Sequence, residues 1–323
     1  MSSTHTANSD NSEAISTSGG RRVAAQITLA SAPGPGKPHN EDLVAAVDSI
    51  ADGITLVLDG ASIPDGLPAC CQRDAAWYVR QLAAQLLAVL AADAQLDLRV
   101  ALAAAIFSVD RVHAATCPAT GHERDRLGPS AMIALTRRAG DQLDWLLLGD
   151  ATLLVNIDEV VAWHSDRRLA AVGQELRARI RRQLRTGGGY ASPTHREALA
   201  SLVETERALR NTGGGYWVAA ADPTAAAHSL TGSCRIGQGA GQIRRFALLS
   251  DGAERAVGTF RLYGSWAALL DALVDDGPMA CIAAVRAAEA CDPDGRCYPR
   301  TRRSDDASAL VCDFGHSLRL PGP

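Results

Sequence analysis

Aspartates beside glycines stand at the ends of three apolar segments of this chain. The segments read ITLVLDGAS, WLLLGDAT and FALLSDGAE, and their aspartates are Asp59, Asp150 and Asp251. Each apolar run has the length of a buried β-strand. Two further acidic groups, Glu41–Asp42 after a Pro/Gly loop and Asp305–Asp306 before a last apolar segment, lie in similar positions. We expect the strand ends to meet at one edge and to gather these carboxylates there.

Ionised carboxylates brought together in this way need a positive partner, because each costs several kcal/mol when it is buried and uncompensated. Hard divalent cations such as Mg²⁺ and Mn²⁺ prefer oxygen ligands, and a glycine lets its own carbonyl approach such an ion. Two ions about 3.5–4 Å apart can hold a hydroxide and clamp a phosphoryl group for in-line attack. A single Asp-Gly is most often only a turn, but the repeated pattern favours a metal site.

The rest of the sequence predicts the elements that position these residues. Apolar segments predict strands at 23–30, 43–47, 54–60 and around the other acidic motifs, with a hairpin at 139–141. Apolar residues at helical spacing predict helix pairs at 69–92 with 96–115, and in the segments WAALLDALVDD and PMACIAAVRAAEA. Paired helices between antiparallel strands predict an α+β fold, a four-layer α-β-β-α sandwich with two central antiparallel sheets flanked by helix pairs.

Length and composition favour one soluble domain. The chain has 323 residues, and no linker divides its body. We expect a disordered polar tail at 1–20, a catalytic domain at 21–316 and a short C-terminal tail at 317–323. The formal charge of −4 and the lack of a basic, aromatic stripe argue against nucleic acid as a partner. No segment has the apolar length of a secretion signal or a bilayer span, which predicts a cytoplasmic protein without a membrane partner.

Two residue groups have plain structural interpretations. The eight cysteines form no CxxC pair and no zinc-ligand spacing, so we interpret most of them as small apolar residues in a reducing compartment. The arginines at 177, 179, 181, 182 and 185 are interpreted as the solvated face of a helix.

Six motifs, in order, resemble those of the type 2C (PPM-type) metal-dependent serine/threonine protein phosphatases, in a form similar to the bacterial ones. They are KPHNED, VLDGAS, GPSAMIAL, LLLGDATLLV, ALLSDGAERAV and SDDASALVCDF, and they cover residues from about 21 to about 316. The resemblance implies the α-β-β-α sandwich and a pair of Mn²⁺ or Mg²⁺ ions. It also implies that a metal-activated hydroxide hydrolyses phosphoserine and phosphothreonine in protein substrates, opposing a serine/threonine kinase.

The resemblance also implies roles for single residues. Asp59 would bridge the two metals, the carbonyl of Gly60 would join one of them, and Asp251 with Asp305 would complete the other. Glu41 would bind directly or through water, and Asp150 would lie near a third, weaker metal position. Lys37 stands where the family has the arginine that holds the substrate phosphate, so we expect it to supply charge without a bidentate fork.

Other positions depart from the family's pattern. Ala61 and Ser62 follow Asp59-Gly60 where many members have a histidine, and His39 is a possible substitute acid. Arg255 stands where many members have an aspartate, which puts the third metal in doubt. These departures leave two alternatives to a phosphoprotein phosphatase: a pseudophosphatase that binds a phosphoprotein partner, or a metal phosphohydrolase for small molecules.

Overall fold

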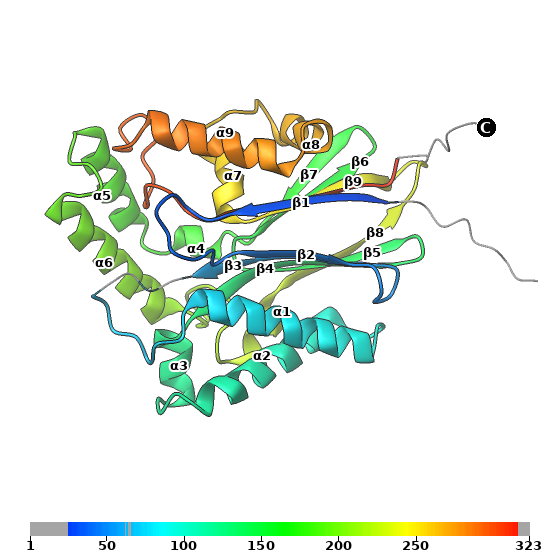
Figure 1. The fold of residues 1–323 in the computed structure, drawn as a ribbon, viewed down its shortest axis with the longest axis horizontal. Coiled ribbons are helices and arrows are strands. Elements are labelled where there is room, and N and C mark those ends of the chain that lie inside the picture. Colours follow the sequence, from blue (N-terminus) through cyan, green and yellow to red (C-terminus); the bar gives the residue numbers. More distant parts are fainter. Residues whose placement is uncertain (1–24, 62, 64–65, 316–323) are drawn as a thin grey trace, which may run out of the picture.

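The computed structural model describes residues 25–61, 63 and 66–315, and shows a mixed α/β chain. The tails expected at 1–20 and 317–323 lie outside the described residues. All ten strands of the described part belong to one hydrogen-bonded sheet that folds back on itself (Figure 1).

The sheet has two halves of five strands. One half contains β1 (Gln26–Ala32), β10 (Ala307–Asp313), β9 (Gln242–Leu249), β6 (Thr152–Ile157) and β7 (Val160–His164). The other contains β2 (Leu43–Val47), β3 (Ile54–Ala61), β4 (Ser130–Ala139), β5 (Gln142–Leu148) and β8 (Leu230–Ile236). Pairing within each half is antiparallel, as expected, but the halves are not separate sheets. β8 and β9 pair in parallel over two residue pairs on either side of the glycine-rich link at 237–241.

Helices cover the outer face of each half, as Figure 1 shows. Helices α1 (Ala75–Ala92) and α2 (Leu98–Ala114) pack on the β2–β5 half around a fully apolar cluster. Helices α7 (Asp251–Gly258), α8 (Trp266–Asp275) and α9 (Pro278–Cys291) cover the other half. A third apolar cluster fills the space between the two halves. The inner strands β3, β4, β5, β6, β9 and β10 are therefore largely buried on both faces, which explains their continuous apolar sequences, whereas β1, β2, β7 and β8 are more exposed.

The first helix begins later than the sequence pattern predicts. Asp74 caps α1 by accepting a hydrogen bond from the backbone N–H of Trp77 at 2.7 Å, so residues 66–74 form a loop and not a helical turn. Helix α1 is also the one helix in the described ranges that is long and apolar enough to cross a membrane. Its buried face, which includes Leu82, Leu86 and Leu90, packs in the cluster under β3 and β4, as in a core helix.

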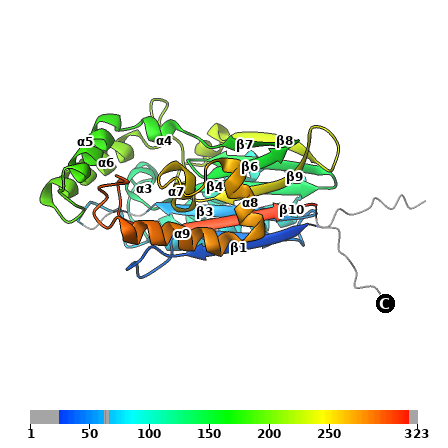
Figure 2. The ribbon, with the colours of Figure 1, turned by 90° about the horizontal axis from the view of Figure 1, so that it is seen from above.

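Two helices form a lobe at one end of the sheet, visible at the left of Figures 1 and 2. They are α5 (Gln174–Arg185) and α6 (Pro193–Leu209), which pack through their own apolar cluster. The described residues also contain α3 (Gly121–Leu127), between α2 and β4, as well as α4 (Arg168–Ala171) before the lobe and a 3₁₀ helix at Pro223–His228 after it. The sequence pattern predicts α5 and α6 but not α3, β7, β8 or α7.

Truncation of a core residue of α2 tests this packing. Leu102 is fully buried, whereas Val100 on the same helix is 52% exposed. We expect Leu102→Ala to lower the free energy of unfolding by about 2–5 kcal/mol, because it leaves a cavity. The matched variant Val100→Ala should change it by less than about 0.5 kcal/mol. Urea unfolding followed by circular dichroism measures both, and equal losses would contradict the assigned burial.

Candidate active site

The acidic site begins at the end of β3. Asp59 still pairs with Met132 of β4, so the strand fixes its backbone within the sheet. Gly60 follows it, and a Cβ at this position would collide with the backbone oxygen of Glu41. The glycine thus allows the segment before β2 to pass directly beside Asp59.

Asp251 reaches the same place from the other half of the sheet. It is the first residue of α7, directly after β9, and its backbone N–H donates to Asp59 Oδ2 at 3.1 Å. The amino end of a helix favours a carboxylate such as that of Asp59. Gly252 is again required by close packing, because an added Cβ would collide with the backbone oxygen of Asp306.

Asp306 holds the Pro/Gly loop in place. Its buried carboxylate accepts hydrogen bonds from the backbone N–H groups of Gly34, at 2.7 Å, and Glu41, at 2.8 Å. The two adjacent aspartates therefore have different tasks, since Asp306 orders the loop while Asp305 lines the cavity of the site.

Lys37 lies in the centre of three carboxylates. Its Nζ lies 3.3 Å from Glu41, 3.0 Å from Asp305 and 3.2 Å from Asp306. These carboxylates raise its pKa although burial opposes the shift. Lys37 is the only lysine in the sequence. A lysine ammonium directs three N–H donors from one nitrogen atom to three carboxylates that are not in one plane. The five donors of a guanidinium all lie in one plane, which accounts for a lysine at this position.

Two arginines add to the positive charge around Asp305. Nη2 of the buried Arg255 lies 3.1 Å from Asp305 Oδ2, and its Nη1 lies 3.4 Å from Glu289. Arg302 approaches Asp305 Oδ1 at 4.0 Å. Burial alone would raise the pKa of Asp305, but Arg302, Arg255 and Lys37 lower it to about 2. Asp305 is therefore a compensated, ionised carboxylate.

The other carboxylates lack such compensation. Burial and neighbouring carboxylates raise the pKa of Asp42 to about 8 and that of Asp150 to about 7. The same causes raise the pKa values of Asp59 and Asp251, although Arg255 and Arg302 partly oppose the shift at Asp251. Asp42 Oδ2 and Asp150 Oδ1 are buried and have no hydrogen-bond partner among the described residues. This side of the site has an excess of buried negative charge.

A cavity of about 130 Å³ opens onto these carboxylates. Its lining includes Asp59, Gly60, Asp150, Asp251 and Asp305, and the α5–α6 lobe provides part of the opposite wall. Lys37 and Glu41 are not among the lining residues. The structure thus brings all the predicted site residues into one neighbourhood, but Lys37 and Glu41 contact the cluster through Asp305 and Asp306 and do not face the cavity.

Several residues of the site were not predicted from the sequence. Arginines that line the cavity are Arg177, Arg207, Arg210 and Arg302. Arg177 corrects the interpretation of the α5 arginines as a solvated face, because it faces the cavity and pairs with Glu206 at 2.5 Å. The others, at 179, 181, 182 and 185, are exposed as expected. Because Arg302 stands three residues before Asp305, its place beside this carboxylate could have been predicted from the sequence.

The donor set suits hard divalent cations. Every candidate ligand is an oxygen atom, two buried carboxylate oxygens have no partner among the described residues, and the raised pKa values show that positive charge is needed there. Asp305 and Glu41 are the exceptions, because Lys37 already pairs with both. An ion that used these two ligands would have to share them with the chain's own cations.

The fold is that of bacterial serine/threonine phosphatases. The crystal structure of PstP/Ppp from Mycobacterium tuberculosis matches with a TM-score of 0.51 and 16% identity, over 90% of this chain and 99% of that one. The S. agalactiae serine/threonine phosphatase matches at 0.54 and 13%, over 90% and 99%. Stp1 from Staphylococcus aureus matches at 0.54 and 11%, over 90% and 95%. No family model and no curated protein sequence matches the chain.

The raised pKa of Asp42 predicts a pH dependence of stability. The folded pKa of about 8 lies above the unfolded value of about 3.9, so the protonated group stabilises the fold fully below pH of about 4. That contribution is lost as the pH rises towards 8, at up to about 1.4 kcal/mol per pH unit. In EDTA, Asp42→Asn should therefore lose less stability than the wild type between pH 5 and pH 8.

Urea unfolding at several pH values measures this difference. The exposed Asp275 provides the control, since Asp275→Asn should follow the wild-type pH profile. Parallel profiles for the wild type and Asp42→Asn would contradict an uncompensated charge at Asp42.

Proposed function

We propose that the protein is a Mn²⁺- or Mg²⁺-dependent serine/threonine protein phosphatase. The observation that carries the proposal is the cavity onto which uncompensated carboxylates open from both halves of the sheet, with arginines in its wall. The fold shared with bacterial phosphatases and the six ordered motifs support it. The three apolar clusters support the finer assignment of the fold as a four-layer α-β-β-α sandwich, with one catalytic domain at 21–316.

The carboxylates would hold the cations. Asp59 would be shared by two ions, with the Gly60 carbonyl as a ligand of one and Asp251 with Asp305 as ligands of the other, and Glu41 would bind directly or through water. Asp150 would serve a third, weaker position. A bound metal pair would supply the Lewis acidity that activates water and neutralises phosphate charge. The protein's own contribution is to fix these oxygens on strand and helix ends.

Positive side chains would hold the substrate phosphate. Lys37 is the residue that the family resemblance implies, but its contacts are to three carboxylates. Arg302 borders Asp305 and lines the cavity, with its side chain 31% exposed. We propose that Arg302 contacts the phosphate, and that Lys37 supplies charge to the same region from behind Asp305.

The substrate would be phosphoserine or phosphothreonine in a protein, and the partner reaction that of an opposing kinase in the cytoplasm. The α5–α6 lobe forms part of the cavity wall, so it would contact residues around the phosphorylated side chain. No histidine is found among the described residues that line the cavity, and His39 is exposed.

Replacement of Asp251 tests the activity. We expect Asp251→Asn to lower kcat/KM for a phosphopeptide, with Mn²⁺ present, by about 100-fold or more, because a ligand charge is lost while the shape is kept. The exposed control Asp275→Asn should retain wild-type activity. Wild-type turnover no faster than that of Asp251→Asn would exclude the enzymatic function.

Arg302 and Lys37 can be separated by kinetics. Arg302→Met should raise KM for p-nitrophenyl phosphate about tenfold with a smaller change in kcat, because a charged hydrogen bond to phosphate is lost. Lys37→Met should lower thermal stability and affect KM less, since three carboxylates lose their common partner. The reverse pattern would assign the phosphate contact to Lys37.

A second candidate is a pseudophosphatase that binds a phosphoprotein without hydrolysing it. The observation that favours it is the compensation of Asp305 by Lys37 and Arg255, which compete with any cation for this ligand. Calorimetry with a phosphopeptide at saturating Mn²⁺ separates the two functions. Binding with no phosphate release would support the pseudophosphatase.

A further inference from the structure

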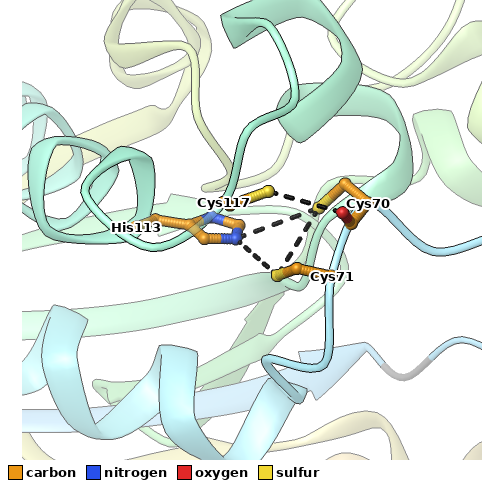
Figure 3. A group of neighbouring side chains, drawn as sticks. All are labelled: Cys70, Cys71, His113 and Cys117. Carbon is orange, nitrogen blue, oxygen red and sulfur yellow. Dashed lines mark hydrogen bonds between the residues drawn. The ribbon is translucent and has the colours of Figure 1, made fainter.

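Three cysteines and one histidine converge on the side of the molecule that carries α1 and α2 (Figure 3). They are Cys70, Cys71, His113 and Cys117, and their sulfur and nitrogen atoms all lie within 4.8 Å of one another. None of these residues lines the cavity of the acidic site. The cluster is therefore a separate feature of the molecule, with ligand chemistry of a different kind.

The cluster connects the loop before α1 with the end of α2. Cys70 and Cys71 lie in the loop at 66–74 that precedes α1, His113 lies in the last turn of α2, and Cys117 follows that helix. The turn is fixed because the backbone N–H of Cys117 donates to the His113 carbonyl at 3.0 Å. His113 and Cys117 are both buried, and the loop cysteines are half-buried.

The interatomic distances are close to those of a tetrahedral ligand set. Zn–S bonds of about 2.3 Å and Zn–N bonds of about 2.0 Å place neighbouring ligand atoms about 3.5–3.8 Å apart in a tetrahedron. Here the sulfur atoms of Cys70 and Cys71 are 3.9 Å apart, and His113 Nε2 lies 3.9 Å from Cys70 Sγ and 3.0 Å from Cys71 Sγ. Small side-chain movements would bring all four atoms onto one ion.

The surroundings suit a neutral imidazole, whereas burial and the neighbouring thiols raise the pKa of Cys70 to about 12, so its thiolate form needs the positive charge of a bound ion. The backbone N–H of Arg73 donates to Cys71 Sγ at 3.4 Å, a contact that stabilises negative charge on sulfur. Burial, with help from Arg124, lowers the pKa of His113, so its Nε2 is available as a ligand. Three thiolates, one imidazole and Zn²⁺ carry a net charge of −1, which the nearby guanidinium group of Arg73 offsets; that of Arg124 also lies near but pairs with Asp110 at 2.7 Å.

We propose that Cys70, Cys71, His113 and Cys117 form a closed Cys₃His site for a structural Zn²⁺ ion. Thiolate and imidazole ligands select zinc over the Mn²⁺ or Mg²⁺ that suits the acidic site. The three thiols bind as thiolates, so their protons pass to solvent on binding. With four protein ligands the ion has no open position, so its task is to hold the structure and not to take part in chemistry.

The ion would fix the loop that leads from the acidic site to α1. Asp59 and Gly60, near the end of β3, lie eleven and ten residues before Cys70, and one side-chain hydrogen bond among the described residues anchors the intervening segment to the wall of the cavity. That anchor is the carbonyl of Pro68, which accepts a hydrogen bond from Arg207 of the cavity wall at 2.8 Å. Zinc would thus fix both the loop and the backbone partner of Arg207.

Metal content and cobalt spectroscopy test the site on the full chain. We expect protein purified without chelator to contain about one zinc ion per chain, measured by inductively coupled plasma mass spectrometry. Replacement by Co²⁺ should give the d–d absorption of a tetrahedral centre and a sulfur-to-cobalt charge-transfer band, which carboxylate ligands cannot produce. The band should persist in Asp251→Asn, so the result does not depend on the proposed phosphatase activity.

Variants assign the ligands. Cys117→Ala should lower the zinc content and the charge-transfer band at least about tenfold, whereas replacement of a buried cysteine of α9, Cys281→Ala, should leave both unchanged. Alkylation with mass spectrometry gives a readout on the wild type alone, because bound zinc should protect Cys70, Cys71 and Cys117. Absence of the cobalt band, an unchanged band in Cys117→Ala, or a disulfide among these cysteines would overturn the proposal.

Discussion

Repulsion between like charges at the end of the folded sheet is the constraint on which the rest of the structure depends. Strands from both halves deliver aspartates to one place, where the surrounding apolar clusters keep water away and strengthen the repulsion. Positive side chains offset the negative charge mainly around Asp305. Lys37, Arg255 and Arg302 surround Asp305, while Asp42, Asp59, Asp150 and Asp251 hold protons more tightly than ordinary carboxylates.

This asymmetry bears on both candidate functions. The uncompensated side has the properties of a cation site, because two of its buried carboxylate oxygens, in Asp42 and Asp150, have no hydrogen-bond partner among the described residues. On the compensated side, the chain's own cations occupy the ligand that a metal would share. Under either proposed function, the competition between a divalent ion and the side chains of Lys37 and Arg255 for Asp305 would separate a catalytic centre from a site that only binds phosphate.

Much of this arrangement could be predicted from the sequence, because its signals are local. Apolar runs that end in Asp-Gly located β3, β9 and Asp150, and the helix pairs followed from apolar spacing. The different tasks of Asp305 and Asp306 could not be predicted, since they depend on which carboxylate meets the backbone of a loop 265 residues away. The cysteine cluster was missed for the same reason. Its residues come from a loop and from the end of a helix, with spacings that match no common zinc motif. The pattern also predicts a helix from residue 69, whereas Asp74 caps α1 and leaves Cys70 and Cys71 in a loop.

The short junction between β8 and β9 has a mechanical consequence. Only two residue pairs join the halves of the sheet there, whereas Asp59 belongs to one half and Asp251 and Asp305 to the other. An ion held jointly by these carboxylates would cross-link the halves at the opposite end from the junction. Its binding would stabilise the closed arrangement by an amount that rises with the free ion concentration, so the supply of divalent cations would set the stability of the molecule against separation of its halves.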